Sequence, residues 1–227
     1  MLPRLRQAVL AAHDLDAVAG QLRAQLDLGE PYCDPGVEVF GLRNAVFAVG
    51  DTFLEVVSPI RADAPAARLL ARRGGDTGYM LMFQVESFDA ARRRAREAGV
   101  REVLDISLDD IAEVHLHPGD MRGAIVSLSR PEPAEAWRWG GPGWRERSAP
   151  YRLSGATITV AEPASVADRW ETVLGGELSG VGVQVNADGA DRGLTEIILT
   201  VDETTERRQE PLVIGGVRFV FERRSDD

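Results

Sequence analysis

The chain has 227 residues, of which 44% are hydrophobic and 27% are charged, a composition typical of a folded globular protein. Its formal net charge of -10 disfavours binding to nucleic acid or to an anionic membrane surface, because their phosphate groups would be repelled. No apolar run approaches the ~20 residues that span a bilayer, and no signal peptide can be recognised at the N-terminus. We therefore expect a cytoplasmic protein whose partner is a small molecule.

Three local features are expected to be structural or exposed. Cys33 is the single cysteine, so no intramolecular disulfide can form, and no neighbouring residue marks it as a nucleophile or a metal ligand. His13 falls in a turn and is expected to face solvent. The cluster formed by Arg92, Arg93, Arg94 and Arg96 could suggest a local anion site, but a solvated helix face is favoured.

The most informative feature of the sequence is internal repetition. Three segments each begin with an apolar strand, turn at a polar stretch, continue as a helix and stop at glycine. The strands begin near Ala8, Tyr79 and Ala156. Aligning the polar turns of the first two segments places Gln7 opposite Met80.

The hydrophobic period changes from about four to two after each helix, which indicates strands separated by turns. Each unit therefore has the order β, α, β, β, β, which predicts the α+β fold class. The expected strands after the helices are 37–39, 42–49 and 52–58 in the first unit, 102–106, 112–117 and 123–129 in the second, and 181–185, 194–201 and 212–222 in the third.

These units divide the chain into paired modules at 1–130, a segment rich in Trp and Pro at 131–150, and a third βαβββ-like module at 151–227. The indoles of the middle segment either pack at a domain junction or form a lid over a pocket. An odd module leaves a sheet edge, so it either shields the first two modules or pairs with a second chain in a homodimer. We expect an exposed loop at 204–210 and a frayed tail at 223–227.

Three stretches carry a resemblance to a known superfamily. Residues 10–16 (LAAHDLD), 52–59 (TFLEVVSP) and 116–128 (LHPGDMRGAIVSL) resemble strand signatures of glyoxalase-like proteins and methylmalonyl-CoA epimerases. The chain is thereby identified as a member of the vicinal oxygen chelate superfamily, which includes glyoxalases and bleomycin-resistance proteins. The resemblance implies a sheet curved around a cleft.

The resemblance also implies a divalent metal in the cleft, where it would polarise substrate oxygens as a Lewis acid. The ligand positions carried over from the family are Gln7, Glu55, Met80 and Ser127. Gln7 and Glu55 match oxygen ligands of glyoxalases, whereas Met80 stands where a histidine is usual and Ser127 where a glutamate is usual. A hard ion such as Mg²⁺ gains little from a thioether sulfur. The usual ligand set is therefore incomplete.

Strand alternation predicts which other side chains face the cleft. If Ser127 points inward, His115 and His117 on the adjoining strand share one face with Glu113. We interpret Glu55 with His115 or His117 as the catalytic acid–base residues. Asn44, Met80 and Ser127 are the candidate substrate-binding residues. A histidine that only makes a structural hydrogen bond is the alternative interpretation for both histidines.

Two functions remain open from the sequence. The first is a glyoxalase-like lyase or isomerase that acts at a carbon next to a carbonyl, with or without a metal. The alternative is a binding or sequestering protein of the bleomycin-resistance type, without chemistry. A metal between Gln7 and Glu55 would favour the enzyme, and an apolar cleft walled by Met80, Met82 and tryptophans would favour the binder. An extradiol dioxygenase is disfavoured, because Gln7 occupies its first histidine position.

Overall fold

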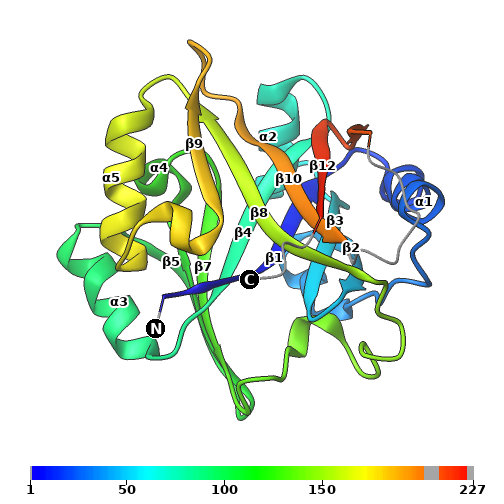
Figure 1. Ribbon diagram of the computed structural model, residues 1–227, viewed down its shortest axis with the longest axis horizontal. Coiled ribbons are helices and arrows are strands. Elements are labelled where there is room, and N and C mark those ends of the chain that lie inside the picture. Colours follow the sequence, from blue (N-terminus) through cyan, green and yellow to red (C-terminus); the bar gives the residue numbers. More distant parts are fainter. Residues whose placement is uncertain (1, 202–209, 224–227) are drawn as a thin grey trace.

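The computed structural model describes residues 2–201 and 210–223, which form two mixed β-sheets with helices packed against them (Figure 1). The predicted loop at 204–210 and tail at 223–227 lie almost entirely outside the described residues. Within the two described ranges, no helix is long and apolar enough to cross a membrane.

The first sheet, sheet A, contains the two predicted modules. The first module and the helix that follows it comprise β1 (Arg4–Ala11), α1 (Leu15–Leu26), the 3-10 helix η1 (Pro35–Phe40), β2 (Leu42–Val49), β3 (Thr52–Pro59) and α2 (Pro65–Arg73). The second module comprises β4 (Thr77–Gln84), α3 (Phe88–Glu97), β5 (Glu102–Ser107), β6 (Ile111–Leu116), α4 (Pro118–Met121) and β7 (Ile125–Pro131). Antiparallel pairing of β1 with β4 joins the modules in the order β2-β3-β1-β4-β7-β6-β5. The predicted α+β fold is confirmed.

The strand predicted at 37–39 is wrong, because that stretch lies in the 3-10 helix η1. The carboxylate of Asp34 accepts a hydrogen bond from the Gly36 amide, Pro35 begins the helix, and Gly41 ends it with a φ of 72°. Pro fixes a helical φ, and Gly adopts the left-handed conformation readily. These flanking residues outweigh the β-propensity of Val37 and Val39.

Helix α1 begins where the sequence predicts. The carboxylate of Asp14 accepts a hydrogen bond from the Ala17 amide at 3.1 Å, and satisfying such an amide stabilises a helix by about 1 kcal/mol. Val18, Leu22 and Leu26 lie buried on one face, as their four-residue spacing predicts. The helix ends before the predicted Gly29, and Asp27 is its left-handed C-cap.

The second sheet, sheet B, has the predicted order of a strand, a helix and further strands, but its strands pair differently from those of the second module. Its elements are β8 (Tyr151–Val160), α5 (Pro163–Leu174), the 3-10 helix η3 (Leu178–Val181), β9 (Val183–Ala187), β10 (Gly193–Val201), β11 (Leu212–Ile214) and β12 (Val217–Arg223). The strand order is β11-β12-β10-β8-β9, with β8 parallel to β9 and antiparallel to β10, and β10 parallel to β12. Five consecutive strands of sheet A, β2-β3-β1-β4-β7, have the same sequence of parallel and antiparallel neighbours. The elements predicted for the third unit are thus present, in a five-stranded sheet of their own.

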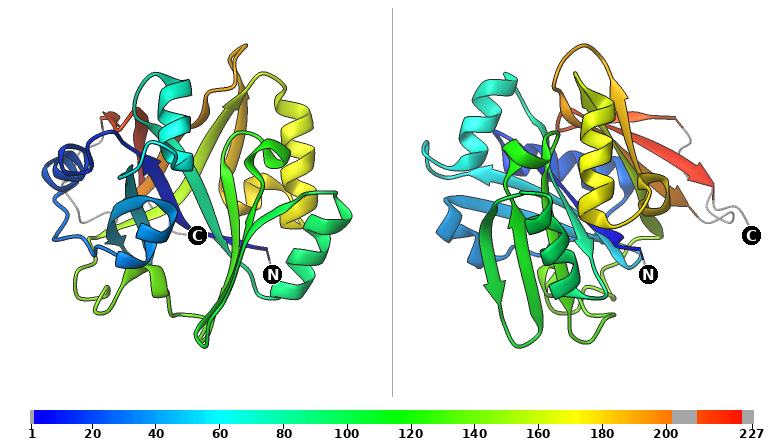
Figure 2. Two further views of the ribbon diagram at one scale, coloured as in Figure 1. Left: turned by 180° about the vertical axis from the view of Figure 1, so that it is seen from behind. Right: turned by 90° about the vertical axis from the view of Figure 1, so that its left-hand side faces the viewer.

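The two sheets share one hydrophobic core. Leu10, Leu54 and Phe83 on one face of sheet A belong to the same buried cluster as Ile158 and Phe219 of sheet B. Helices α1, α3 and α5 contribute to this cluster as well, and Figure 2 shows sheet B and helices α1 and α3 arranged around sheet A. The opposite face of sheet A, which we call the site face, carries a separate cluster that includes Val9, Phe53 and Met80.

A close approach between the sheets depends on Gly78 of β4. A Cβ atom at this position would lie 2.3 Å from the carbonyl oxygen and 2.4 Å from the Cβ of Leu194 in β10. Backbone atoms cannot move aside as a flexible side chain can, so any side chain at position 78 would separate the sheets.

We expect Gly78→Ala to lower the free energy of unfolding by about 1–3 kcal/mol, the usual cost of overpacking a core. Urea unfolding followed by circular dichroism measures this change. Gly75→Ala is the matched control, because its added Cβ would meet nothing within 4 Å. Equal stability of the two variants would contradict this account of the sheet contact.

Candidate active site on sheet A

The pairing of β1 with β4 relates the two modules by an approximate two-fold axis. Gln7 pairs with Met82 and Val9 pairs with Met80, so a rotation that exchanges the two strands also exchanges Gln7 with Met80. Val9 lies beside Glu55 of β3, and Met82 lies beside Ser127 of β7. Glu55 and Ser127 are therefore equivalent as well, and the four positions suggested by the resemblance occupy equivalent places in the two modules.

Glu55 is the centre of a buried polar cluster. Its Oε2 accepts a hydrogen bond from Nε2 of Gln7, and its Oε1 accepts one from Nδ2 of Asn44, both at 2.7 Å. The Asn44 oxygen accepts a hydrogen bond from the Asp34 amide at 2.8 Å. Gln7, Asn44 and Glu55 are 1%, 4% and 8% exposed, so these three predicted site residues form one connected network.

The environment of Glu55 changes its acidity. Burial raises the pKa of Glu55 to about 7 by penalising the charged form, although the hydrogen bonds from Asn44 and Gln7 oppose the shift. The negative charges of Asp34 and Glu113 raise the pKa further. A carboxyl group with a pKa near neutrality can both accept and return a proton at physiological pH. Burial also raises the pKa of the neighbouring Tyr79 to about 12, and the charge of Glu55 adds to that shift.

A second polar cluster surrounds Glu113 of β6. Its Oε2 accepts hydrogen bonds from Ser129 Oγ at 2.7 Å and from the indole Nε1 of Trp139 at 2.6 Å. Its Oε1 contacts Nε2 of His115. Ser127 Oγ lies 3.3 Å from Ser129 Oγ, so Ser127 joins this cluster. Strand alternation predicted the face of Glu113 correctly, but the predicted catalytic set did not include it.

The two predicted histidines do not lie together. His115 lies on the site face in contact with Glu113, and 21% of its side chain is exposed. Strand β6 ends at Leu116, and His117 instead begins helix α4, where its Nδ1 accepts a hydrogen bond from the Gly119 amide. Alternation holds only within a strand, so it does not carry over to His117. The structure places His117 beside Arg101 and Asp120, outside both polar clusters.

The segment 132–150 covers the site face. Trp137 is 2% exposed, and its indole Nε1 donates a hydrogen bond to Gln7 Oε1 at 2.7 Å. Its ring stacks on Phe53 at a centroid distance of 6.1 Å, while Trp144 meets Phe53 edge-on at 5.2 Å. Both tryptophans belong to the same apolar cluster as Met80 and Met82. The segment therefore covers the site as well as connecting the sheets.

Arginine and histidine side chains elsewhere have structural partners or face solvent. Arg92 and Arg96 hydrogen-bond Glu102, and Arg94 donates to the carbonyls of Val173 and Leu174 at the C-terminal end of α5. His13 and Cys33 are exposed, as predicted for His13.

The metal that the superfamily implies does not fit these residues. A divalent ion requires several ligands that converge on one point at about 2.0–2.6 Å. Gln7 instead directs its amide nitrogen at Glu55 and its oxygen at Trp137, Met80 lies in the apolar cluster, and Ser127 contacts Ser129. Across residues 2–201 and 210–223, no three His, Cys, Asp or Glu side chains are grouped as metal ligands would be.

The paired modules of sheet A, with their equivalent positions on one face, have the fold of the vicinal oxygen chelate superfamily, as the sequence resemblance predicted. The chain belongs to the family of proteins with a glyoxalase-like domain, whose model matches residues 8–174. This match extends through the Trp-containing segment and β8 to the end of α5.

Its relatives include two epimerases. The chain is 30% identical over 137 residues to the ethylmalonyl-CoA/methylmalonyl-CoA epimerase of Cereibacter sphaeroides, covering 57% of this chain and 99% of that protein. It is 26% identical over 136 residues to the mitochondrial methylmalonyl-CoA epimerase of Homo sapiens, covering 57% of this chain and 74% of that protein. A solved structure of a variant methylmalonyl-CoA epimerase of Streptomyces coelicolor, in complex with 2-nitronate-propionyl-CoA, aligns with a TM-score of 0.51 at 25% identity, over 60% of this chain and 100% of that chain.

The acidity of Glu55 predicts how stability depends on pH. Its pKa in the folded protein, about 7, is above the ordinary value of 4.5, so the folded state keeps a proton that the unfolded state releases. The stability that this retained proton gives the folded state is complete below about pH 4.5 and is lost as the pH rises through 7. The Glu55→Gln variant has no titrating group at this position. Between these two pH limits, the free energy of unfolding of the wild type should therefore fall by up to roughly 3 kcal/mol relative to that of the variant.

Urea unfolding at a series of pH values measures this difference. Glu97→Gln is the matched control, because Glu97 is an exposed residue of α3, and it should follow the wild-type curve. Parallel curves for the wild type and Glu55→Gln would show that Glu55 has the same pKa in the folded and unfolded states.

Proposed function

We propose that this protein is an isomerase that moves a proton at a carbon next to a carbonyl group of a small molecule, with Glu55 as the acid–base residue and no chelated metal. The observation that carries the proposal is the buried Glu55 carboxyl group, whose pKa of about 7 suits proton transfer at neutral pH. The epimerase relatives support the isomerase class.

The reaction divides into two proton transfers. The ionised Glu55 takes the proton from the carbon, and the electron pair of the C–H bond moves toward the carbonyl carbon as the carbonyl oxygen becomes an enolate oxygen. A proton is then returned to the carbon, either by Glu55 or, from a different side, by the carboxyl group of Glu113. The charge of Glu113 is near enough to raise the pKa of Glu55, so both carboxyl groups face one region.

The enolate oxygen needs hydrogen-bond donors, since no metal would be present to stabilise it. Donors fixed in a water-excluded site are worth more than they are in water, because they need not reorient during the reaction. The amides of Gln7 and Asn44 and the indole N–H groups of Trp137 and Trp139 are the donors at this face. Their present hydrogen bonds show that each can direct an N–H group toward an anionic or carbonyl oxygen.

A substrate reaches Glu55 only if the covering segment moves. Glu55 is 8% exposed and Trp137 is 2% exposed, so the indole and a substrate cannot occupy the same space. We propose that substrate binding displaces Trp137 from Phe53 and Gln7, and that the segment 132–150 closes over the bound molecule. Closure of this kind keeps water from the reacting atoms.

The proposal predicts deuterium exchange at the reacting carbon. The malonyl-type CoA esters in the names of the relatives are the first compounds to test, in deuterated buffer, with exchange followed by NMR. Glu55→Gln should slow exchange by about 10²-fold or more, because a general base typically contributes that much. Treatment with a chelator should leave the wild-type rate unchanged.

Glu97→Gln again serves as the control and should exchange at the wild-type rate, since Glu97 lies exposed on α3. A Glu55→Gln variant that exchanges as fast as the wild type would overturn the role of Glu55. Loss of exchange on chelation would overturn the absence of a metal while leaving the isomerase class intact.

A binding protein without chemistry is the second candidate, and one observation favours it. Met80 and Met82 lie with Trp137 and Trp144 in one apolar cluster, and methionine and aromatic side chains suit the binding of apolar ligands. In that case the same compounds would quench tryptophan fluorescence on binding, and no deuterium would enter them.

A further inference from the structure

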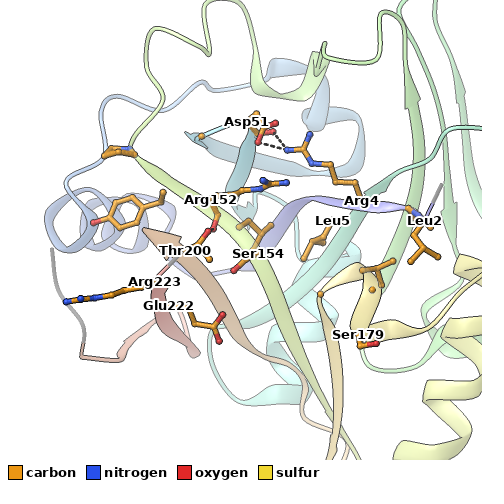
Figure 3. A pocket seen from close by; sticks show the side chains of 18 residues that line it. Leu2, Arg4, Leu5, Asp51, Arg152, Ser154, Ser179, Thr200, Glu222 and Arg223 are labelled. Atoms are coloured by element: carbon orange, nitrogen blue, oxygen red, sulfur yellow. Dashed lines mark hydrogen bonds and ion pairs between the residues drawn. The ribbon is translucent and has the colours of Figure 1, made fainter. Parts of the chain in front are cut away.

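The structure contains a large cavity away from the site face. It has a volume of about 910 Å³ and lies between the start of β1, the turn from β2 to β3, and the β8, β10 and η3 elements of sheet B (Figure 3). Cavities of this size accommodate small-molecule ligands. Neither Glu55 nor Glu113 lines it.

Positive charge gathers beside this cavity although the whole chain carries a net charge of -10. Three arginines and two carboxylates line the cavity: Arg4 from β1, Arg152 from β8, Arg223 and Glu222 from β12, and Asp51. The pKa of Arg6 is lowered to about 10, chiefly by burial and also by the charges of Arg4, Arg145 and Arg152, whereas Asp51 opposes the shift. Three guanidinium groups, those of Arg4, Arg6 and Arg152, therefore act on the Asp51 carboxylate.

The Asp51 carboxylate does not use all of the available donors. Arg4 pairs with Asp51 through Nη2, while its buried Nε has no hydrogen-bond partner. Arg6 does not line the cavity: its guanidinium donates to the Glu135 carbonyl and lies over the ring of Trp137. Within residues 2–201 and 210–223, the guanidinium of Arg152 forms no ion pair. The guanidinium of Arg152 thus stands at the cavity wall without a carboxylate partner among these residues, an arrangement that suits an anionic ligand.

The charges of these residues act on each other directly. Burial would raise the pKa of Asp51, but the hydrogen bond and charge of Arg4 and the charges of Arg152 and Arg6 outweigh it, so the pKa is lowered. Asp51 thus stays ionised and competes with any anion for Arg4. Arg152 forms no ion pair with any residue that the structure describes, so no such carboxylate competes with an anion for its guanidinium.

We propose that this cavity binds a small molecule through a phosphate group, which Arg4 and Arg152 hold from two different strands. A guanidinium fork matches the oxygens of a phosphate. A tetrahedral phosphate can accept hydrogen bonds from two forks that approach in different directions, which a planar carboxylate does less well. The hydroxyls of Ser154 and Ser179 and the side chains of Leu2 and Leu5 complete a wall that suits a partly polar ligand body.

This inference does not depend on Glu55 acting as a base. The test is isothermal titration of the full chain with inorganic phosphate and with ADP at low ionic strength. Both should bind, and Arg152→Ala should weaken each by at least about 10-fold, the loss expected for one charge-assisted contact. Asp51→Asn should tighten binding severalfold, because it removes the carboxylate that competes for Arg4.

Arg93→Ala is the matched control, since it makes the same change in net charge at an exposed position of α3 and should bind as the wild type does. Arg152→Gln, which keeps more of the side-chain stem, should show the same loss as Arg152→Ala if the variants remain folded. Absence of binding by both probes up to about 1 mM, or equal weakening in Arg93→Ala, would overturn the proposal. Deuterium exchange is a separate readout, so failure here and failure of the isomerase proposal are distinguishable.

Discussion

The antiparallel pairing of β1 with β4 is the constraint on which the site depends. Side chains in a strand alternate between faces, so a slip of one residue would bring Gln7 into the apolar core and Leu10 out of it. The observed register keeps Leu10 in the core shared with sheet B and Gln7 on the site face. On its other side, β1 pairs in parallel with β3, which sets Glu55 beside Val9 and brings its carboxyl group within reach of the Gln7 amide.

The polar groups placed on this face are stable there because each has a partner. An unpaired buried donor or acceptor costs about 1–3 kcal/mol, and the site face contains two carboxyl groups, two amides and two serines. Glu55 receives two amide donors, Glu113 receives a hydroxyl and an indole donor, and Gln7 receives the second indole. Two of these donors come from the segment 132–150, so the cover and the polar clusters stabilise one another.

Much of this arrangement could be predicted from the sequence, because it follows from periodicity. The strand–helix repeats located both modules, and alternation placed Glu113 and His115 on the face of Ser127, whereas Gln7 and Glu55 were assigned to the cleft by the family resemblance. The partners of Trp137 and Trp139 could not be predicted, since these hydrogen bonds join residues far apart in the chain. The pairing of β8 with β9 was missed for a related reason: a strand–helix–strand pattern fixes the order of elements but not which strands become neighbours. His117 was misplaced because its strand ends one residue earlier.

The two modules have diverged at equivalent positions, and this divergence separates the environments of the two carboxyl groups. Asn44 pairs with Val57, and Glu113 pairs with Ser129, so Asn44 and Glu113 are equivalent in the same way as Glu55 and Ser127. One module therefore carries its carboxyl group on the last strand and the other carries it on the preceding strand. Glu55 meets two neutral amides, whereas Glu113 meets a hydroxyl, an indole and an imidazole that can carry positive charge. The two carboxyl groups of the site face therefore lie in different surroundings, although the strands that carry them belong to modules of the same design.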